Sequence, residues 1–362
     1  MKNFTENASK HATAAKTVQR VVAKEKKMLL DVTILTGFLG SGKTTLINYL
    51  LEQSKNERIA IIENEFGAVG VDGALLKSSP DVEIVELSNG CVCCSIRGEL
   101  TEALKGILDK MDQGLFQADR LILETTGLAD PAPIIQTFFV DETIRERIRL
   151  DAVITLVDAI HCLKQLDEHR VCASQIGFAD RIILTKADCV DEAQKQSVLE
   201  RLASINSKAE IFEAYQGVLP KEVWIGIGAF ELSDALKINQ GVYEVKDAQN
   251  IRFKSFSASK PARSFNDDIE SYVFRAEKLD LTRIGAFMEA LIEEWGNDML
   301  RYKGVLAIQD EPKRLIVQGV HKVVGFDYGS EWGEEEATSL LVVIGRKIPY
   351  ERLAEKFQAC GA

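Results

Sequence analysis

Histidine is scarce in this chain: only four of its 362 residues are histidine, and none of them forms a tract. This scarcity excludes a histidine-rich metal store. Long apolar runs are also missing, because no stretch approaches the ~20 residues that a membrane-crossing helix needs. The N-terminus lacks the apolar segment of a secretory signal. We therefore expect a soluble, cytoplasmic protein with no membrane partner.

Positive charge is in deficit as well. Lysine and arginine together number 44, against 55 aspartates and glutamates, which gives a net charge of −11. Because contacts to nucleic-acid phosphates need clustered lysine and arginine, this balance argues against a nucleic-acid partner. The exception is the tail of residues 1–28, where basic residues outnumber acidic ones. We interpret this tail as a disordered leader; a targeting peptide and a partner-binding arm are the alternatives.

Cysteine is unevenly distributed. Four of the seven cysteines stand alone in the sequence, as small buried side chains often do, and an intracellular chain is not expected to carry a disulfide framework. Cys91, Cys93 and Cys94 instead follow a turn signal within one short segment. Thiolates select Zn²⁺ and other thiophilic ions over Mg²⁺, and three sulfurs leave a fourth tetrahedral position open. We predict a transition-metal site here; a redox dithiol and buried small hydrophobes are the alternatives.

The chain divides into segments that differ in their pattern of apolar and polar residues. Over residues 29–238, short apolar runs alternate with amphipathic helical segments, which predicts βαβ units around a mainly parallel sheet. Residues 239–268 are polar, and we interpret them as a linker. Strands predominate over residues 269–362. The predicted fold class is α/β, with a smaller α+β domain at the C-terminus.

The strongest local signal is GFLGSGKTT at residues 37–45, which matches the pattern GxxxxGK followed by Thr and lies between an apolar strand and a helix. Its glycines let the backbone wrap around phosphate groups, and the following helix presents its positive end to them. We expect Lys43 to contact the β- and γ-phosphates and the Thr44 hydroxyl to coordinate Mg²⁺. A glycine-rich turn without a ligand does not account for strand, loop, Lys-Thr and helix together.

The choice of base rests on TKAD at residues 185–188, directly after an apolar strand. This segment resembles the base-recognition motif of GTPases, in which Asp188 would accept hydrogen bonds from guanine N1 and N2 and the stem of Lys186 would pack over the ring. Adenine presents an acceptor at N1, which the carboxylate would disfavour, and such mismatches discriminate strongly. The motif therefore favours guanine.

Carboxylates end two further apolar strands. Glu124 is followed by Gly127, whose backbone can approach a γ-phosphate, and we expect Glu124 on the Mg²⁺ side of the site; a helix cap is the alternative. Glu63 belongs either to the nucleotide site or to the cysteine site. Asp158 stands at a similar strand end, but no motif surrounds it.

Together GFLGSGKTT, IENEFG, GCVCC, ETTGLADP and TKAD, in this order, resemble the CobW-type metallochaperone GTPases, and the resemblance spans residues 29–362. It implies a SIMIBI-class P-loop GTPase domain at 29–238 and a CobW-like C-terminal domain at 269–362. It also implies Mg²⁺-dependent GTP hydrolysis and Zn²⁺ or another transition metal at the CxCC motif. By position it assigns phosphate to Gly40, Ser41, Gly42, Lys43, Thr44 and Thr45, guanine to Lys186 and Asp188, and the metal to Cys91, Cys93 and Cys94.

From the residues themselves we also expect Gly127 at the nucleotide site and Glu63 at the transition-metal site. We expect three catalytic groups, Lys43, Thr44 and Glu124, of which Thr44 and Glu124 also lie on the Mg²⁺ side. We predict a GTPase that binds a transition metal and transfers it to a client protein. Ordering of the segments on either side of the CxCC by GTP would change the metal site on hydrolysis. A metal sensor or buffer without a client and a P-loop small-molecule kinase are the alternatives. The sequence leaves the client and the oligomeric state open.

Overall fold

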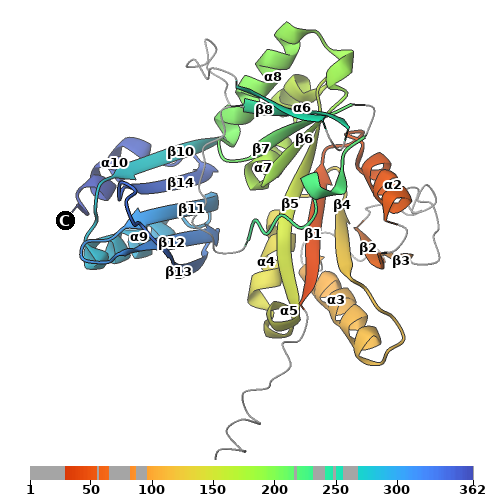
Figure 1. Cartoon of the computed structure of the whole chain (residues 1–362), viewed down its shortest axis with the longest axis horizontal. Coiled ribbons are helices and arrows are strands. Elements are labelled where there is room, and N and C mark those ends of the chain that lie inside the picture. Colours follow the sequence, from red (N-terminus) through yellow and green to blue (C-terminus); the bar gives the residue numbers. More distant parts are fainter. Residues whose placement is uncertain are drawn as a thin grey trace, which may run out of the picture.

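The computed structural model of the protein describes residues 29–54, 57–64, 82–86, 96–215, 218–230, 241–247, 250–255 and 268–361. The tail of residues 1–28 and the three cysteines of the CxCC motif lie outside these ranges. The described chain forms two sheets, each with its own helices (Figure 1). In spatial order, the strands of the first sheet are β3 (Val82–Glu86), β2 (Ile59–Asn64), β4 (Arg120–Thr125), β1 (Leu30–Gly37), β5 (Ile148–Asp158), β6 (Arg181–Thr185), β7 (Glu210–Ala214), β8 (Gly241–Asp247) and β9 (Asn250–Ser255).

The first sheet is parallel from β3 to β8, and only β9 runs antiparallel to its neighbour. Its central strands are apolar on both faces because helices cover both sides. The helices and 3₁₀ turns of this domain are α2 (Lys43–Gln53), α3 (Ile96–Asp112), α4 (Ala132–Val140), α5 (Glu142–Arg147), α6 (Cys162–Glu168), α7 (Arg170–Phe178), η2 (Ala187–Cys189), α8 (Glu192–Ile205) and η3 (Lys221–Val223).

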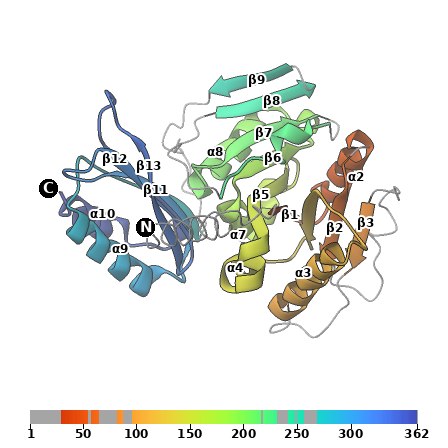
Figure 2. The ribbon, with the colours of Figure 1, turned by 60° about the horizontal axis from the view of Figure 1, so that its bottom comes forward.

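The two faces of the sheet have separate cores. On one face, Val32 and Ile34 of β1 pack with side chains from α3, α4, α7 and α8. On the other face, Leu35 of β1 packs with α2 and with the buried Trp224. Figure 2 shows the sheet with helices on its two sides. The predicted α/β class with a mainly parallel sheet is confirmed.

Residues 241–247 and 250–255 form strands, whereas the sequence led us to expect a linker at 239–268. Strand β8 pairs in parallel with β7, and β9 pairs with β8, so both extend the first sheet at its edge. Edge strands need bury only part of their surface, so their sequence lacks the continuous apolar pattern of the central strands. Phe253, for example, is largely exposed.

The second sheet has the spatial order β10 (Ile269–Ala276), β14 (Ser339–Arg346), β11 (Met299–Ala307), β12 (Lys313–Val320) and β13 (Val323–Glu331), and its pairs are antiparallel. Helices α9 (Leu281–Trp295) and α10 (Tyr350–Gln358) cover it. Asp280 directly precedes helix α9, and its carboxylate accepts a hydrogen bond from the Arg283 backbone N–H at 2.8 Å and so caps the helix. A core that includes Phe274, Tyr302 and Phe357 joins sheet and helices.

The two domains are fastened together through Arg301 of β11. Its guanidinium lies 2.5 Å from the carboxylate of Asp180, donates to the Phe178 carbonyl at 3.3 Å and stacks 4.1 Å from the ring centroid of Phe230. Helix α7 also packs closely on the second domain, because a Cβ added at Gly177 would lie 2.8 Å from Leu300. The end of α7 is therefore fixed against the C-terminal domain.

Within the described ranges, no helix combines the length and the apolar character that crossing a membrane requires.

Candidate nucleotide site

The loop after β1 is built to surround an anion. Gly40 and Gly42 adopt positive φ angles of 73° and 98°, which suit glycine. Gly37 must be glycine for a different reason: a Cβ there would lie 2.4 Å from the Leu156 carbonyl oxygen. Helix α2 begins at Lys43, directly after Gly42, so its free N–H groups face the loop. The loop and helix start predicted from the sequence are present.

The side chains of the loop are arranged around the same space. The Lys43 ammonium donates to the carbonyls of Gly37 at 2.9 Å and Phe38 at 3.3 Å, which places it inside the loop. The Ser41 hydroxyl is buried and has no hydrogen-bond partner among the described residues. A buried hydroxyl without a partner is costly, and a bound phosphate oxygen would supply one. Thr44 is half-buried and Thr45 is exposed at the start of α2.

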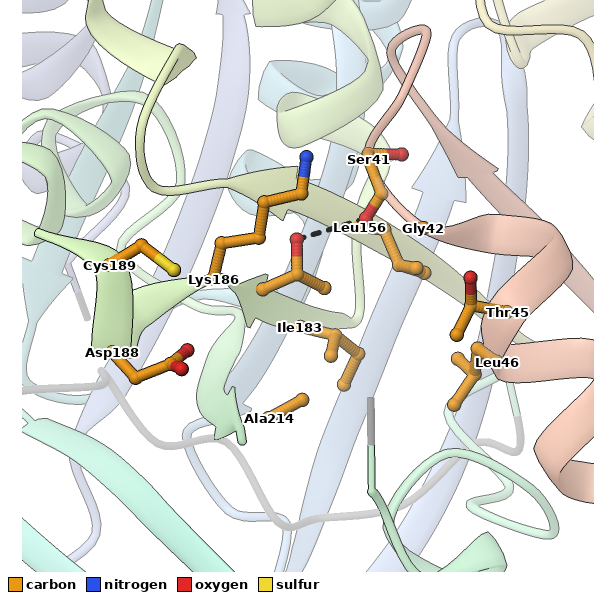
Figure 3. Close-up of a pocket in the computed structure, with 11 residues that line it drawn as sticks. Ser41, Gly42, Thr45, Leu46, Leu156, Ile183, Lys186, Asp188, Cys189 and Ala214 are labelled. Atoms are coloured by element: carbon orange, nitrogen blue, oxygen red, sulfur yellow. Dashed lines mark hydrogen bonds between the residues drawn. The ribbon is translucent and has the colours of Figure 1, made fainter. Parts of the chain in front are cut away.

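A pocket of about 240 Å³ adjoins this loop. Its floor contains the apolar side chains of Leu156 and Ile183, and Lys186 and Asp188 stand on the wall opposite Thr45 and Leu46 (Figure 3). The pocket thus offers an apolar floor for a ring and a carboxylate near its edge, as recognition of a base requires. The exposed Cys189 also lines it, which the sequence did not indicate.

The TKAD segment is tied to the phosphate loop by its own side chains. The Thr185 hydroxyl donates to the Ser41 carbonyl at 2.9 Å, and the Lys186 ammonium donates to the Gly40 carbonyl at 3.1 Å (Figure 3 shows the first bond). Lys186 has a φ of 55°, which lets the chain turn after β6. The two motifs, about 140 residues apart in sequence, therefore form one site.

Asp158, which had only a weak claim from the sequence, contacts the TKAD segment directly. It ends β5 and is 2% exposed, and its Oδ2 lies 2.7 Å from the Lys186 ammonium. Burial raises the pKa of Asp158, but hydrogen bonds from Lys186 and His161 outweigh burial and lower the pKa below its usual range. The carboxylate is therefore ionised at neutral pH. Only its place at a strand end pointed to it in the sequence.

Glu124 and Gly127 approach the loop from β4. Glu124 is buried and is the register partner of Leu35 on β1, two residues before Gly37. A Cβ added at Gly127 would lie 2.6 Å from the backbone nitrogen of Leu39, so only glycine lets the two loops touch. This segment therefore lies directly against the phosphate loop.

Side chains of α7 form hydrogen bonds with the segment after Glu124. The Gln175 amide, which is buried, donates to the carbonyls of Gly127 at 3.2 Å and Ala129 at 3.1 Å. Asp130 accepts a hydrogen bond from the Ser174 hydroxyl at 3.1 Å and lies 3.9 Å from the Arg346 guanidinium of β14. The segment expected to sense a γ-phosphate thus contacts both α7 and the C-terminal domain.

Glu63 lies beside Glu124, because β2 and β4 are parallel neighbours and these two residues are register partners. Both are buried. On its other side Glu63 is the register partner of Glu86, the last residue of β3. The predicted metal ligands Cys91, Cys93 and Cys94 follow Glu86 closely in sequence but lie outside the described ranges, in which no group of three or more His, Cys, Asp or Glu side chains could hold a metal ion.

Both domains match known protein families. Residues 31–213 match the family described as CobW/HypB/UreG, nucleotide-binding domain, and residues 269–361 match the cobalamin synthesis protein cobW C-terminal domain. The two matches fall on the two sheets.

Similar proteins align with this chain over almost its whole length. The zinc chaperone YjiA of Escherichia coli is 42% identical over 329 residues, which cover 91% of this chain and 98% of the relative. The zinc chaperone CobW of Pseudomonas aeruginosa is 33% identical, with 91% of each protein covered. The crystal structure of Zn(II)-bound YjiA GTPase from E. coli superposes with a TM-score of 0.74 at 34% identity, over 92% of this chain and all of that one.

Proposed function

The chain belongs to the CobW family of P-loop proteins, and from this membership we propose that it is a GTP-hydrolysing metallochaperone that binds Zn²⁺ at its CxCC motif and transfers it to a client protein. The observation that carries the proposal is that the loop of residues 37–45 contacts two other segments. The TKAD segment bonds to Ser41 of the loop beside the base pocket, and Gly127 lies against Leu39 of the same loop.

The phosphate end of the site suits GTP and Mg²⁺. The positive-φ glycines and the start of α2 form a cradle of N–H groups. Lys43 is placed inside the loop, where its charge would stabilise the transferring phosphoryl group, and Thr44 would coordinate Mg²⁺. Glu124 would stand on the Mg²⁺ side, and Gly127, which lies against Leu39 of the loop, would bring backbone groups close to the γ-phosphate. Mg²⁺ would neutralise charge between the β- and γ-phosphates.

The base end suits guanine. The floor is apolar and the exposed carboxylate of Asp188 lines the pocket. A carboxylate accepts hydrogen bonds but cannot donate them, so it pairs with the N1–H and N2–H groups of guanine and disfavours the acceptor N1 of adenine. The stem of Lys186 would pack along the ring.

The metal assignment rests on the chemistry of the donors. Cys91, Cys93 and Cys94 supply soft thiolates, which select Zn²⁺ over Mg²⁺. Glu63 is proposed as a further ligand, since it is buried beside the strand that leads to the cysteines. Its register partner Glu124 is the residue proposed for the Mg²⁺ side of the nucleotide site. A change at Glu124 on hydrolysis therefore has a short path to Glu63, which would let GTP turnover release the cargo.

The proposal is tested by phosphate release from GTP and ATP and by Zn²⁺ competition with a chromophoric chelator. The wild-type chain should prefer GTP, and Lys43→Ala should slow release by orders of magnitude. Replacing Cys91, Cys93 and Cys94 by Ser should abolish tight Zn²⁺ binding and leave GDP affinity close to wild type. Cys189→Ser, which removes an exposed single thiol, is the matched control and should keep the Zn²⁺ site.

Three results would refute parts of the proposal. Zn²⁺ affinity that survives in the triple variant would place the metal elsewhere. Wild-type turnover by Lys43→Ala would assign the activity to another site. Preference for ATP with a phosphorylated small-molecule product would favour a kinase.

A further inference from the structure

The Asp158 carboxylate, at the end of β5, makes three polar contacts. It accepts from the Ile160 backbone N–H at 2.8 Å and from the Lys186 ammonium at 2.7 Å, and it lies 2.9 Å from Nδ1 of His161. The first and last of these contacts hold the turn between β5 and α6. A neutral asparagine could make them as well. Only the contact with Lys186 pairs the carboxylate with a positive charge, and such charge-assisted bonds are stronger than neutral ones.

The position of Lys186 explains why a charge would matter. Its side chain is 40% exposed, so water reaches part of it. A lysine side chain with four rotatable bonds samples many conformers unless its ammonium is held. Here the ammonium is held from two sides, by the Asp158 carboxylate and by the Gly40 carbonyl at 3.1 Å. The stem is thereby kept along one wall of the base pocket before any ligand binds.

We propose that Asp158 is a positioning residue for nucleotide binding: its carboxylate locks the Lys186 ammonium against the phosphate loop, so that the Lys186 stem is a preformed wall for the guanine ring. The inference rests on the proposed guanine-nucleotide site. It assigns to β5, which carries none of the sequence motifs used to recognise the site, the task of joining the base pocket to the phosphate loop. Preorganisation of this kind strengthens binding because the ordering cost is met in the free protein.

If Asp158 acts by positioning Lys186, its effect on GDP affinity should depend on Lys186. Asp158→Asn should weaken GDP affinity roughly tenfold, the scale of one lost charge-assisted hydrogen bond. Lys186→Met should weaken it by a similar factor. The double variant should be no weaker than Lys186→Met alone, because without the ammonium the carboxylate has nothing to position. At saturating GTP, turnover of Asp158→Asn should stay within about twofold of wild type, since the change affects binding and not the reacting phosphate.

The experiment is this double-mutant cycle, measured with the full chain by GDP titration and by kcat and KM for GTP. His161→Gln is the matched control: it alters another partner of the same carboxylate and should leave GDP affinity unchanged. Lys186→Gln examines the same contact from its exposed side; it removes the charge, keeps a hydrogen-bond donor, and should weaken GDP affinity to a similar extent.

Additive effects in the cycle would overturn the inference, as would wild-type GDP affinity in Asp158→Asn or, if that variant does not fold, in Lys186→Gln. A loss in His161→Gln equal to that in Asp158→Asn would show that the turn, and not Lys186, is what Asp158 supports. A wild-type chain that binds no GDP would refute the proposed function itself and the inference with it; binding by wild type with an additive cycle refutes the inference alone.

Discussion

Replacing Gly127 by alanine tests the contact between the two loops that would enclose a γ-phosphate. The added Cβ would lie 2.6 Å from the backbone nitrogen of Leu39 and 2.6 Å from its Cδ2, whereas ordinary contacts begin at 3.4 Å. The leucine side chain can rotate away, but the backbone cannot. The loops must therefore separate by ~0.8 Å, because the backbone of Leu39 lies directly against the added atom.

A displacement of this size is large for a reaction that depends on positioning. Misplacement by about 1 Å can reduce a rate ~100-fold, so Gly127→Ala should lower kcat for GTP by roughly 10- to 100-fold. GDP affinity should change much less, because Gly127 is expected beside the γ-phosphate, which GDP lacks. Phosphate release under single-turnover conditions, together with GDP titration, separates the two effects.

Gly106→Ala is the matched control for this substitution. Gly106 lies in α3, and no atom lies within 4 Å of a Cβ added there. The control should keep wild-type turnover and gain about 0.5–1 kcal/mol of stability from helix propensity. Wild-type kcat in Gly127→Ala would show that the contact with Leu39 has no part in turnover.

Two further predictions concern the base and the domain interface. Asp188→Ala should erase most of the preference for GTP over ATP, a loss of ~1.5–3 kcal/mol measured from paired affinities, and equal affinities in the wild type would contradict the guanine assignment. Lys208 lies at the domain interface with a side chain that is 14% exposed; burial and the nearby Arg301 lower its pKa to about 7, from 10.5. Because the unfolded chain then binds more protons between those pH values, the free energy of unfolding should rise from pH 7 toward pH 10. Denaturant unfolding of Lys208→Met should show a smaller rise, and an unchanged slope would refute this account.

Local patterns in the sequence predicted much of the nucleotide domain. Helix α8 spans the predicted residues 192–205, since its apolar period and its cap at Asp191 are both local features. The loop of residues 37–45 and the strand before TKAD are likewise recognisable from short segments. In each case the residues that form the structure are neighbours in the chain.

The remaining features depend on residues far apart in sequence. Asp158 and Lys186 are 28 positions apart, and Arg301 and Asp180 are 121 apart, so no local pattern links them. The pairing of Glu63 with Glu124 depends on β2 lying next to β4, which the order of the strands in the sequence does not reveal. Strands β8 and β9 were missed because edge strands carry a weak apolar pattern.

The most direct test of the metallochaperone account is Zn²⁺ affinity in three states of the full chain: without nucleotide, with GDP, and with a non-hydrolysable GTP analogue. Because Glu63 of the proposed metal site is the register partner of Glu124 of the proposed nucleotide site, the two sites should be coupled. We predict that Zn²⁺ affinity differs between the GDP and GTP-analogue states by about 5- to 150-fold, and that Zn²⁺ changes nucleotide affinity by the same factor. Identical Zn²⁺ affinity in all three states would contradict a switch within this chain.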